Sequence, residues 1–215
     1  MLDKIAALPG VASAGFVSTL PMESRPVKPP ILIEGQTVAD APTPRGIKFV
    51  SPGYFDTMGT RIIAGRDIAW SDIETGGRVA VISEDFAREL APEPSGALGK
   101  RIRTFAATDA WREVVGVVRS VREAGLYEDA PSFVYWPALV EQMYGTPVRA
   151  TQFAAFVIRS ERAGTASLMN KVRRAVWSVN ASVPITAERT MQDLYAGSLA
   201  RTSFTLVLLA IAGGM

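Results

Sequence analysis

The sequence predicts a mixed α+β fold in which a split βαβ lobe is built from both ends of the chain and a β-rich lobe is inserted between them. The 215 residues are 48% hydrophobic, which is ample for a core. Helix and strand patterns alternate near both ends, whereas short β-rich segments separated by glycine turns fill the middle. The predicted boundaries are residues 1–60 and 146–200 for the first lobe and 61–145 for the inserted lobe.

Proline and glycine mark the limits of the first elements. Pro9-Gly10 stops an initial helix, and several prolines keep residues 22–30 extended. Pro52 stands where a first helical turn favours proline, and Gly59 ends that helix. The elements expected here are, in chain order, a helix at 2–8, strands at 11–20, 31–35 and 46–50, and a helix at 53–58.

Runs of β-branched residues predict the later strands, at residues 78–82, 114–118, 132–136, 153–159 and 183–185. The strand at 114–118 is apolar on both faces, which indicates a central position in a sheet. Ser83 is the expected N-cap of a helix at 84–91. Thr165 should cap a further helix, one face of which carries Leu168, Val172, Ala175, Val176 and Val179.

The last residues form an apolar tail. A helical pattern from Met191 to Arg201 runs directly into the uncharged segment 204–215. As a helix this segment would reach about 18 Å, short of the ~30 Å hydrocarbon core of a bilayer. It therefore predicts either the truncated start of a transmembrane helix at 202–215 or a buried C-terminal helix, and the absence of a polar face favours the first. Its large apolar residues include Phe204, Leu206, Leu208, Leu209 and Ile211. Both chain ends are expected to be cuts in a longer protein.

Composition argues against several classes of function. The chain contains no cysteine and no histidine, which removes thiol chemistry, disulfides and the commonest general base and metal ligand. A net charge of +2 without long charged runs gives no nucleic-acid surface. Residues 95–101 resemble a phosphate loop only superficially, since Pro94 and Arg101 replace a required glycine and hydroxyl residue. The carboxylates have turn or helix-start positions, so no catalytic residue, cofactor or metal is expected.

Six blocks of sequence, in order over roughly residues 8–137, carry a resemblance to a known family. They are residues 8–11, 50–55 with 58–59, 64–67, 79–84 with 86–87, 98–102, and 114–118 with 121–122. The chain resembles the periplasmic core domain of MacB-type, FtsX-like ABC transporter permeases, in particular the large duplicated permeases. Two positions depart from the family pattern: Arg119-Ser120 stands where Gly-Asp is expected, and Thr60-Arg61 where Ile-Pro is common. The motif residues, expected to be structural, include Pro52, Gly53, Tyr54, Phe55, Gly65, Arg66, Asp67, Gly99, Lys100 and Gly116.

The resemblance implies a domain between the first and second membrane helices of a permease in the bacterial inner membrane, on its periplasmic side. It also implies that the lobe built from both chain ends is a porter-like lobe, with the β-rich lobe inserted into it. It implies a separate cytoplasmic ATPase that acts through the rest of the permease, pairing with a second permease half or an identical copy, and a periplasmic or outer-membrane partner. The leading interpretation is a non-enzymatic domain that couples ATP-driven motion to export or to such a partner. A protein-binding scaffold without transport is the alternative, and a membrane-anchored enzyme comes third.

Overall fold

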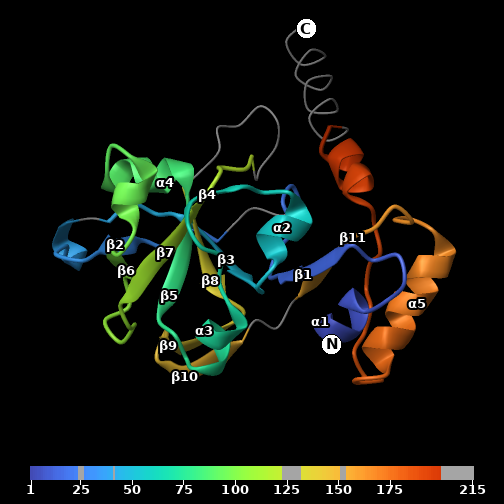
Figure 1. Cartoon of the computed structure of the whole chain (residues 1–215). Coiled ribbons are helices and arrows are strands. Elements are labelled where there is room, and N and C mark those ends of the chain that lie inside the picture. Colours follow the sequence, from blue (N-terminus) through green and yellow to red (C-terminus); the bar gives the residue numbers. More distant parts are fainter. Residues whose placement is uncertain (24–26, 41, 123–131, 151–153, 200–215) are drawn as a thin grey trace, which may run out of the picture.

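The computed structural model of the chain describes residues 1–23, 27–40, 42–122, 132–150 and 154–199. These residues form a mixed α+β domain around a large mixed sheet (Figure 1). The predicted α+β class is therefore confirmed. The apolar tail, from Phe204 onward, lies outside the described residues.

Nine of the described strands form one sheet in the order β11-β1-β3-β8-β5-β7-β6-β2, with β4 added beside β7. The pairs β3/β8 and β5/β7 are parallel, and the other pairs are antiparallel. The predicted central strand at 114–118 lies within β7, which pairs with β4, β5 and β6. The strands are β1 (Ser13–Val17), β2 (Ile31–Ile33), β3 (Gly46–Val50), β4 (Ile62–Gly65), β5 (Val79–Ser83), β6 (Arg101–Thr104), β7 (Arg112–Val118), β8 (Phe133–Pro137) and β11 (Ala155–Arg159), and a separate hairpin joins β9 (Leu139–Met143) to β10 (Thr146–Ala150).

The helices are α1 (Leu2–Ala6), α2 (Tyr54–Met58), α3 (Trp70–Glu74), α4 (Glu84–Leu90) and α5 (Ala166–Trp177), with 3₁₀ turns at Val38–Asp40 and Pro94–Ala97. Thr165 caps α5 as predicted, since its hydroxyl accepts from the Leu168 N–H at 3.4 Å. Ser83 occupies the predicted N-cap position of α4, but its hydroxyl accepts from the Phe133 N–H of β8 at 2.8 Å. The Ser120 hydroxyl serves α4 instead, accepting from the Asp85 N–H at 3.1 Å.

Alternation along the central strands gives the sheet two apolar faces. In β5, Ala80 and Ile82 join one core cluster while Val81 joins the other. In β8, Val134 and Trp136 face the first cluster, whereas Phe133 and Tyr135 face the second. Because consecutive strand residues point to opposite faces, these strands are buried on both sides.

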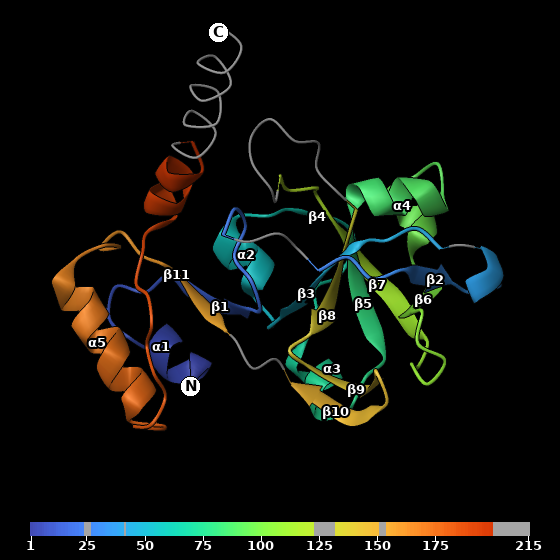
Figure 2. The ribbon, with the colours of Figure 1, turned by 180° about the vertical axis from the view of Figure 1, so that it is seen from behind.

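A third core, here called the chain-end core, is built from both ends of the chain. Ile5 of α1 is buried with Leu168, Val172 and Val176 of α5. The antiparallel ribbon of β1 and β11 carries this core on one face, through Ala14, Phe156 and Ile158. Figures 1 and 2 show α1 and α5 together on one side of this ribbon, apart from the central sheet.

Two expectations for this region are wrong. Val179 lies beyond the end of α5 and is 48% exposed, so it is not part of the buried helix face. Residues 183–185 form no strand, because Pro184 has no N–H for a ladder; Val183 and Ile185 pack against the chain-end core without one.

Residues 191–199 are helical, as the pattern predicted. The helix begins after Thr190, which exchanges capping hydrogen bonds with Asp193: the Thr190 N–H donates to Asp193 Oδ2 at 2.8 Å and the Asp193 N–H donates to Thr190 Oγ1 at 3.1 Å. The Thr190 hydroxyl also donates to Asp193 Oδ2, at 2.7 Å, and this bond, followed by that from the Thr190 N–H, lowers the pKa of the Asp193 carboxyl. Within the described part of the chain, no helix has the length and apolarity needed to cross a membrane.

Candidate functional site

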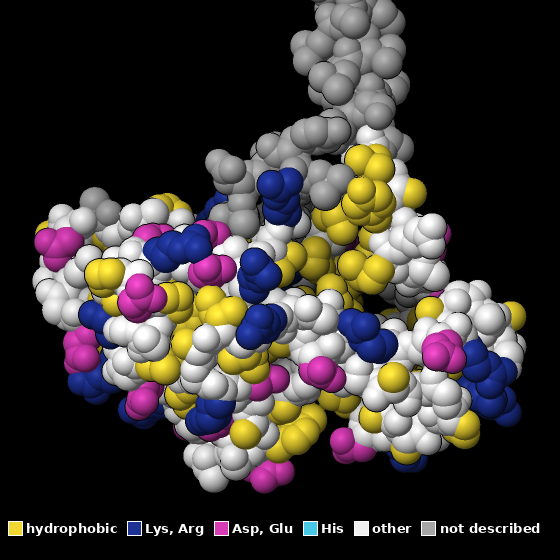
Figure 3. All heavy atoms as spheres, turned by 45° about the horizontal axis from the view of Figure 1, so that its top comes forward, with side chains coloured by type: hydrophobic (Ala, Val, Ile, Leu, Met, Phe, Trp, Pro, Cys, Tyr) yellow, Lys and Arg dark blue, Asp and Glu magenta, His cyan; other side chains and the backbone are white. Residues whose placement is uncertain are grey.

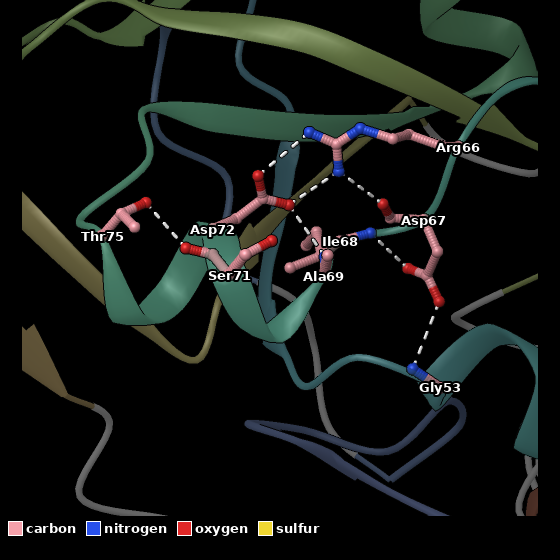
Figure 4. Close-up of polar contacts among 8 residues, drawn as sticks. All are labelled: Gly53, Arg66, Asp67, Ile68, Ala69, Ser71, Asp72 and Thr75. Atoms are coloured by element: carbon pink, nitrogen blue, oxygen red, sulfur yellow. Dashed lines mark hydrogen bonds and ion pairs between the residues drawn. The ribbon is translucent and has the colours of Figure 1, made fainter.

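The structure gathers five of the motif residues into one polar junction beside α2. We call this the α2 junction; it consists of Gly53, Gly65, Arg66, Asp67 and Gly116, drawn in part in Figure 4. Gly53 is the N-cap of α2, and Gly116 lies in the middle of β7. Gly65 ends β4, and Arg66 and Asp67 follow it in the segment that leads to α3.

Asp67 ties the loop after β4 to the start of α2. Its Oδ2 accepts from the Gly53 N–H at 3.2 Å, and its Oδ1 accepts from the Ile68 N–H at 2.7 Å. Burial raises the pKa of the Asp67 carboxyl, and the two backbone donors and nearby Arg66 only partly oppose this. The junction thus holds a desolvated carboxylate between two backbone amides.

Arg66 fixes the other side of the same loop. Its guanidinium forms a two-pronged pair with Asp72 of α3, at 2.7 and 2.9 Å, and donates to the Asp67 carbonyl oxygen at 2.9 Å. Asp72 also accepts from the Ala69 N–H at 2.8 Å, which closes the first turn of α3. The hydrogen bond from Arg66 is the main cause that lowers the pKa of Asp72. The geometry leaves the loop little freedom.

Two glycines allow this loop to cross β7 at close range. Gly65 has φ +69°, the left-handed backbone that side chains disfavour. A Cβ atom at Gly116 would lie 2.0 Å from the Arg66 carbonyl oxygen, while the Arg66 N–H donates to the Val115 carbonyl oxygen at 2.9 Å. Gly65 thus forms a turn, and Gly116 lies where that turn crosses the central strand at close range.

The helix α2 also contacts the β1–β11 ribbon. A Cβ atom on Gly15 of β1 would lie 2.8 Å from the Tyr54 Cα, so the helix backbone rests directly on that strand. On β11, the Arg159 Nε donates to the Thr57 carbonyl oxygen at 3.1 Å. The Phe55 ring packs edge-on against Tyr135 of the central sheet, with centroids 5.0 Å apart. The helix therefore contacts both the chain-end ribbon and the central sheet.

The remaining motif residues lie elsewhere. Pro52 precedes α2, whereas Gly99 and Lys100 precede β6. The Gly99 N–H donates to the Val114 carbonyl oxygen at 2.9 Å, and the Val114 N–H donates to that of Lys100 at 2.8 Å. These two residues extend the β6–β7 ladder and do not touch α2. The contacts of Arg159 and Ser120 were not predicted from sequence, because their partners lie far away along the chain.

The described residues contain no group of three or more acidic, histidine or cysteine side chains placed to hold a metal. A cavity of about 410 Å³ lies beside the first residues of β5, β6 and β7. Its lining includes Arg78, Arg101, Asp109, Trp111, Glu113 and Gln142. Through its contacts, the α2 junction can hold the β1–β11 ribbon and the central sheet in fixed positions relative to each other.

Asp67→Asn tests the electrostatic cost of the junction. Because the folded-state pKa of Asp67 is raised above its usual value of 3.8, folding favours the protonated form. Its contribution to stability is therefore present in acid and is lost as pH rises from the unfolded pKa through the folded pKa. We expect the unfolding free energy of the wild type, relative to Asp67→Asn, to fall as pH is raised from about 3.5 to neutrality. Denaturant titrations of both chains across that range measure the difference, and a difference that rises with pH would contradict the burial of this carboxylate.

Solved structures of similar fold come from transporter proteins. The chain matches the periplasmic region of MacB from Actinobacillus actinomycetemcomitans with a TM-score of 0.55 and 14% identity, over 84% of this chain and 72% of that one. It matches a domain of a putative permease from Porphyromonas gingivalis with a TM-score of 0.53 and 16% identity, over 86% and 81% of the two chains. The extracellular domain of the noncanonic ABC-type transporter YknZ from Gram-positive bacteria gives 0.51 and 17%, over 84% and 80%.

No curated protein sequence matches the chain at a significant level. The likenesses to the three solved structures show a shared fold. The family of MacB-like periplasmic core domains, by contrast, matches the sequence itself, over residues 3–184. The chain therefore belongs to the MacB-like periplasmic core domain family, the non-catalytic periplasmic or extracellular domain of an ABC transporter permease.

Proposed function

We propose that the chain couples ATP-driven motion of its permease to export, or to the control of a periplasmic partner. Motion of a membrane helix that begins at residues 202–215 would enter the domain through the helix at 191–199. It would then pass from the chain-end core to the central sheet. The observation that carries this proposal is the set of contacts that hold the start of the helix at 191–199.

Two consecutive residues before the helix are bound to different parts of the domain. Glu188 accepts two hydrogen bonds from Arg173 of α5, one of them at 2.6 Å from Nε. Arg189 forms an ion pair with Glu23, in the segment that follows β1. Thr190 then caps the helix. We call Arg173, Glu188, Arg189 and Glu23 the helix clamp; a helix that turns or shifts would pull on α5 and on the β1 segment together.

The α2 junction would carry that movement onward, because α2 contacts the β1–β11 ribbon and the central sheet. We keep the two-lobe division, residues 1–60 with 146–200 and residues 61–145, as part of this proposal. The pairs β2/β6 and β3/β8 would then link the lobes. Lobes joined in this way can shift against each other only slightly without breaking ladder hydrogen bonds, so we expect small movements.

The proposed partners follow from membership of the family. A cytoplasmic ATPase would act through the rest of the permease in the bacterial inner membrane. A second permease half or an identical copy would complete the transporter, and a periplasmic or outer-membrane protein would receive the movement. No ATP site is proposed in this chain. The segment that superficially resembled a phosphate loop forms a 3₁₀ turn, Pro94–Ala97, and the approach to β6.

A flexible insertion tests the coupling. Inserting Gly-Gly-Ser-Gly after Ser198 of the complete permease should abolish export while ATP hydrolysis and folding persist, because a flexible joint transmits little force or torque. Inserting Ala-Ala-Lys-Ala at the same site adds the same length but preserves helix, so it should retain more export than the glycine insertion. Export assays in cells and ATPase assays of the purified transporter provide the measurements. Full export with the flexible insertion would eliminate this route and favour the scaffold interpretation.

A further inference from the structure

A cavity opens between the β6–β7 loop, the β9–β10 hairpin and the first residues of β5, β6 and β7. Figures 1 and 2 both place this loop and this hairpin at the same end of the sheet. The cavity volume is about 410 Å³, within the range of about 300–1,000 Å³ that is typical of small-molecule sites. We call it the hairpin cavity, and its lining includes Arg78, Arg101, Asp109, Trp111, Glu113 and Gln142. It shares no lining residue with the α2 junction or the helix clamp.

The wall formed by the β6–β7 loop is held in place by its own contacts. Asp109 is 5% exposed, and its carboxylate accepts hydrogen bonds from the Thr104 hydroxyl and the Tyr144 N–H. The Ala110 N–H donates to the Gln142 carbonyl oxygen at 3.1 Å, which ties the loop to the hairpin. A wall that is ordered in advance lowers the free-energy cost of binding a ligand, because less conformational freedom is lost.

Trp111 and Gln142 are fixed at opposite sides of the cavity, one in the loop and one in the hairpin. The Arg103 guanidinium lies 4.8 Å from the centroid of the Trp111 ring and covers one of its faces. Gln142 has φ +48°, and its Oε1 accepts a hydrogen bond from Arg78 at 2.9 Å. Residues held in such uncommon backbone conformations cluster at functional sites, where the surrounding contacts maintain them. An aromatic ring beside a few polar groups is the usual lining of a ligand site.

Two charged side chains of the hairpin cavity form no ion pair with another described residue. The first is Glu113, whose cross-strand neighbour on β6 is Arg101, and opposite charges in such positions usually pair. Arg101 instead pairs with Glu34, donating from Nε at 2.9 Å, and this leaves the Glu113 carboxylate without an ionic partner in the described part of the chain. The second is Arg78, whose described side-chain hydrogen bond goes to the neutral amide of Gln142.

The charges that line the cavity balance, since two arginines face two carboxylates. Arg101 and Asp109 are already bound within the protein, so Glu113 and Arg78 remain to receive one positive and one negative ligand group. On the face of the molecule drawn in Figure 3, acidic and basic side chains are interspersed, so the wider surface there does not favour ligands of one sign. These features select a ligand that carries both charges and no net charge.

We propose that the hairpin cavity binds a small zwitterion that carries an ammonium and a carboxylate group, as free amino acids and dipeptides do. The Glu113 carboxylate would accept hydrogen bonds from the ammonium group, and the Arg78 guanidinium would donate to the ligand carboxylate. The Glu113 N–H donates to the Arg78 carbonyl oxygen at 2.8 Å, so the two residues are near enough to bind both ends of one small molecule. The Trp111 ring would pack against an apolar or aromatic side chain of the ligand.

NMR titration of the full chain with L-phenylalanine and with glycyl-L-phenylalanine tests the proposal. At least one of the two probes should bind the wild type with a dissociation constant in the millimolar range or below, and should shift amide signals of the cavity residues. Glu113→Gln and Arg78→Gln should each weaken this binding roughly tenfold, the loss expected for a hydrogen bond between charged groups. Capped forms of the bound probe then assign the two groups. The N-acetylated form should bind the wild type and Glu113→Gln equally, and the C-terminal amide should bind the wild type and Arg78→Gln equally.

A matched control changes the same two residue types in the turn that follows β11. Glu161 and Arg162 are exposed there, and β1, β3 and β8 separate β11 from the strands beside the cavity. Glu161→Gln and Arg162→Gln should therefore bind the probe like the wild type. The proposal is wrong if neither probe binds the wild type, if folded Glu113→Gln keeps wild-type affinity, or if the control variants lose as much affinity as the cavity variants. Circular dichroism verifies folding, and Arg78→Lys, which keeps the charge, replaces Arg78→Gln if that chain unfolds.

Discussion

Gly116→Ala is expected to lower the free energy of unfolding by about 3–4 kcal/mol, near the upper end of single-substitution effects. The added Cβ would lie 2.0 Å from the Arg66 carbonyl oxygen, which is backbone and cannot rotate away. Relief requires the loop after β4 to lift off β7, and this would break the hydrogen bond from the Arg66 N–H to Val115. Urea titration of the wild-type and variant chains measures the loss.

Gly99→Ala is the matched control. Gly99, unlike Gly116, has a left-handed backbone, φ +77°, but no described atom lies within 4 Å of its added Cβ. Gly99→Ala should therefore lower the free energy of unfolding only by the penalty for a left-handed alanine, about 1–2 kcal/mol. Gly65→Ala combines both causes, φ +69° and a Cβ placed 2.2 Å from the Val115 carbonyl oxygen, and should resemble Gly116→Ala or exceed it. Equal losses in Gly99→Ala and Gly116→Ala would show that the close crossing does not exist in solution.

Arg112→Met should lower the free energy of unfolding by about 3 kcal/mol and loosen the β9–β10 hairpin. Arg112 is 1% exposed, and its guanidinium donates to the carbonyl oxygens of Ala110, Glu141 and Gln142. Burial lowers the pKa of this guanidinium, and the nearby Asp109 carboxylate opposes that shift. Gln142 has φ +48°, an uncommon backbone for this residue type, and Arg112 holds it in place. Methionine fills a similar volume but removes the guanidinium donor from three carbonyl oxygens, of which that of Gln142 keeps a second donor, the Ala110 N–H at 3.1 Å.

Urea titration gives the stability change, and amide hydrogen exchange in β9 and β10 reports the hairpin. Arg101→Met provides the comparison, because Arg101 lies on neighbouring β6 and pairs with Glu34 while its side chain is 51% exposed. A surface pair of this kind is worth about 0–1 kcal/mol. An Arg112→Met chain that loses no more stability than Arg101→Met would contradict the structural role of the buried arginine.

Local chemistry made many elements predictable. Proline and glycine stops located α1 and α2, and β-branched runs located β5 and β7, because these signals act within a few residues. The pairing of strands was beyond such reasoning: nothing in Ile31–Ile33 indicates β6 as its partner rather than another apolar strand. Ladder partners are selected by the packing of the whole sheet. The strand predicted at 183–185, which the structure lacks, shows the same limit of local reasoning. Apolar residues can pack against a core without forming the hydrogen bonds of a β-ladder.

The α2 junction was predictable in its parts but not as an assembly. The resemblance singled out Gly53, Asp67 and Gly116, yet only the folded chain shows that Asp67 binds the Gly53 N–H. Ser120 differs from these residues because it does not match the family motif. Its motif position was identified as a departure, and the structure shows that its hydroxyl still serves the start of α4. Buried Arg112 had no sequence signal, because arginine is usually an exposed residue.

The β1–β11 ribbon has a consequence for the order in which the domain matures. Ser160 bonds to the Gly10 carbonyl oxygen across 150 residues, and the ribbon itself joins segments of comparable separation. Contacts between such distant segments are the slowest to form, since loop closure precedes any gain in contact energy. A permease domain that emerges from its N-terminal side during membrane insertion would thus wait, with α1 and β1 unsatisfied, until β11 and α5 arrive.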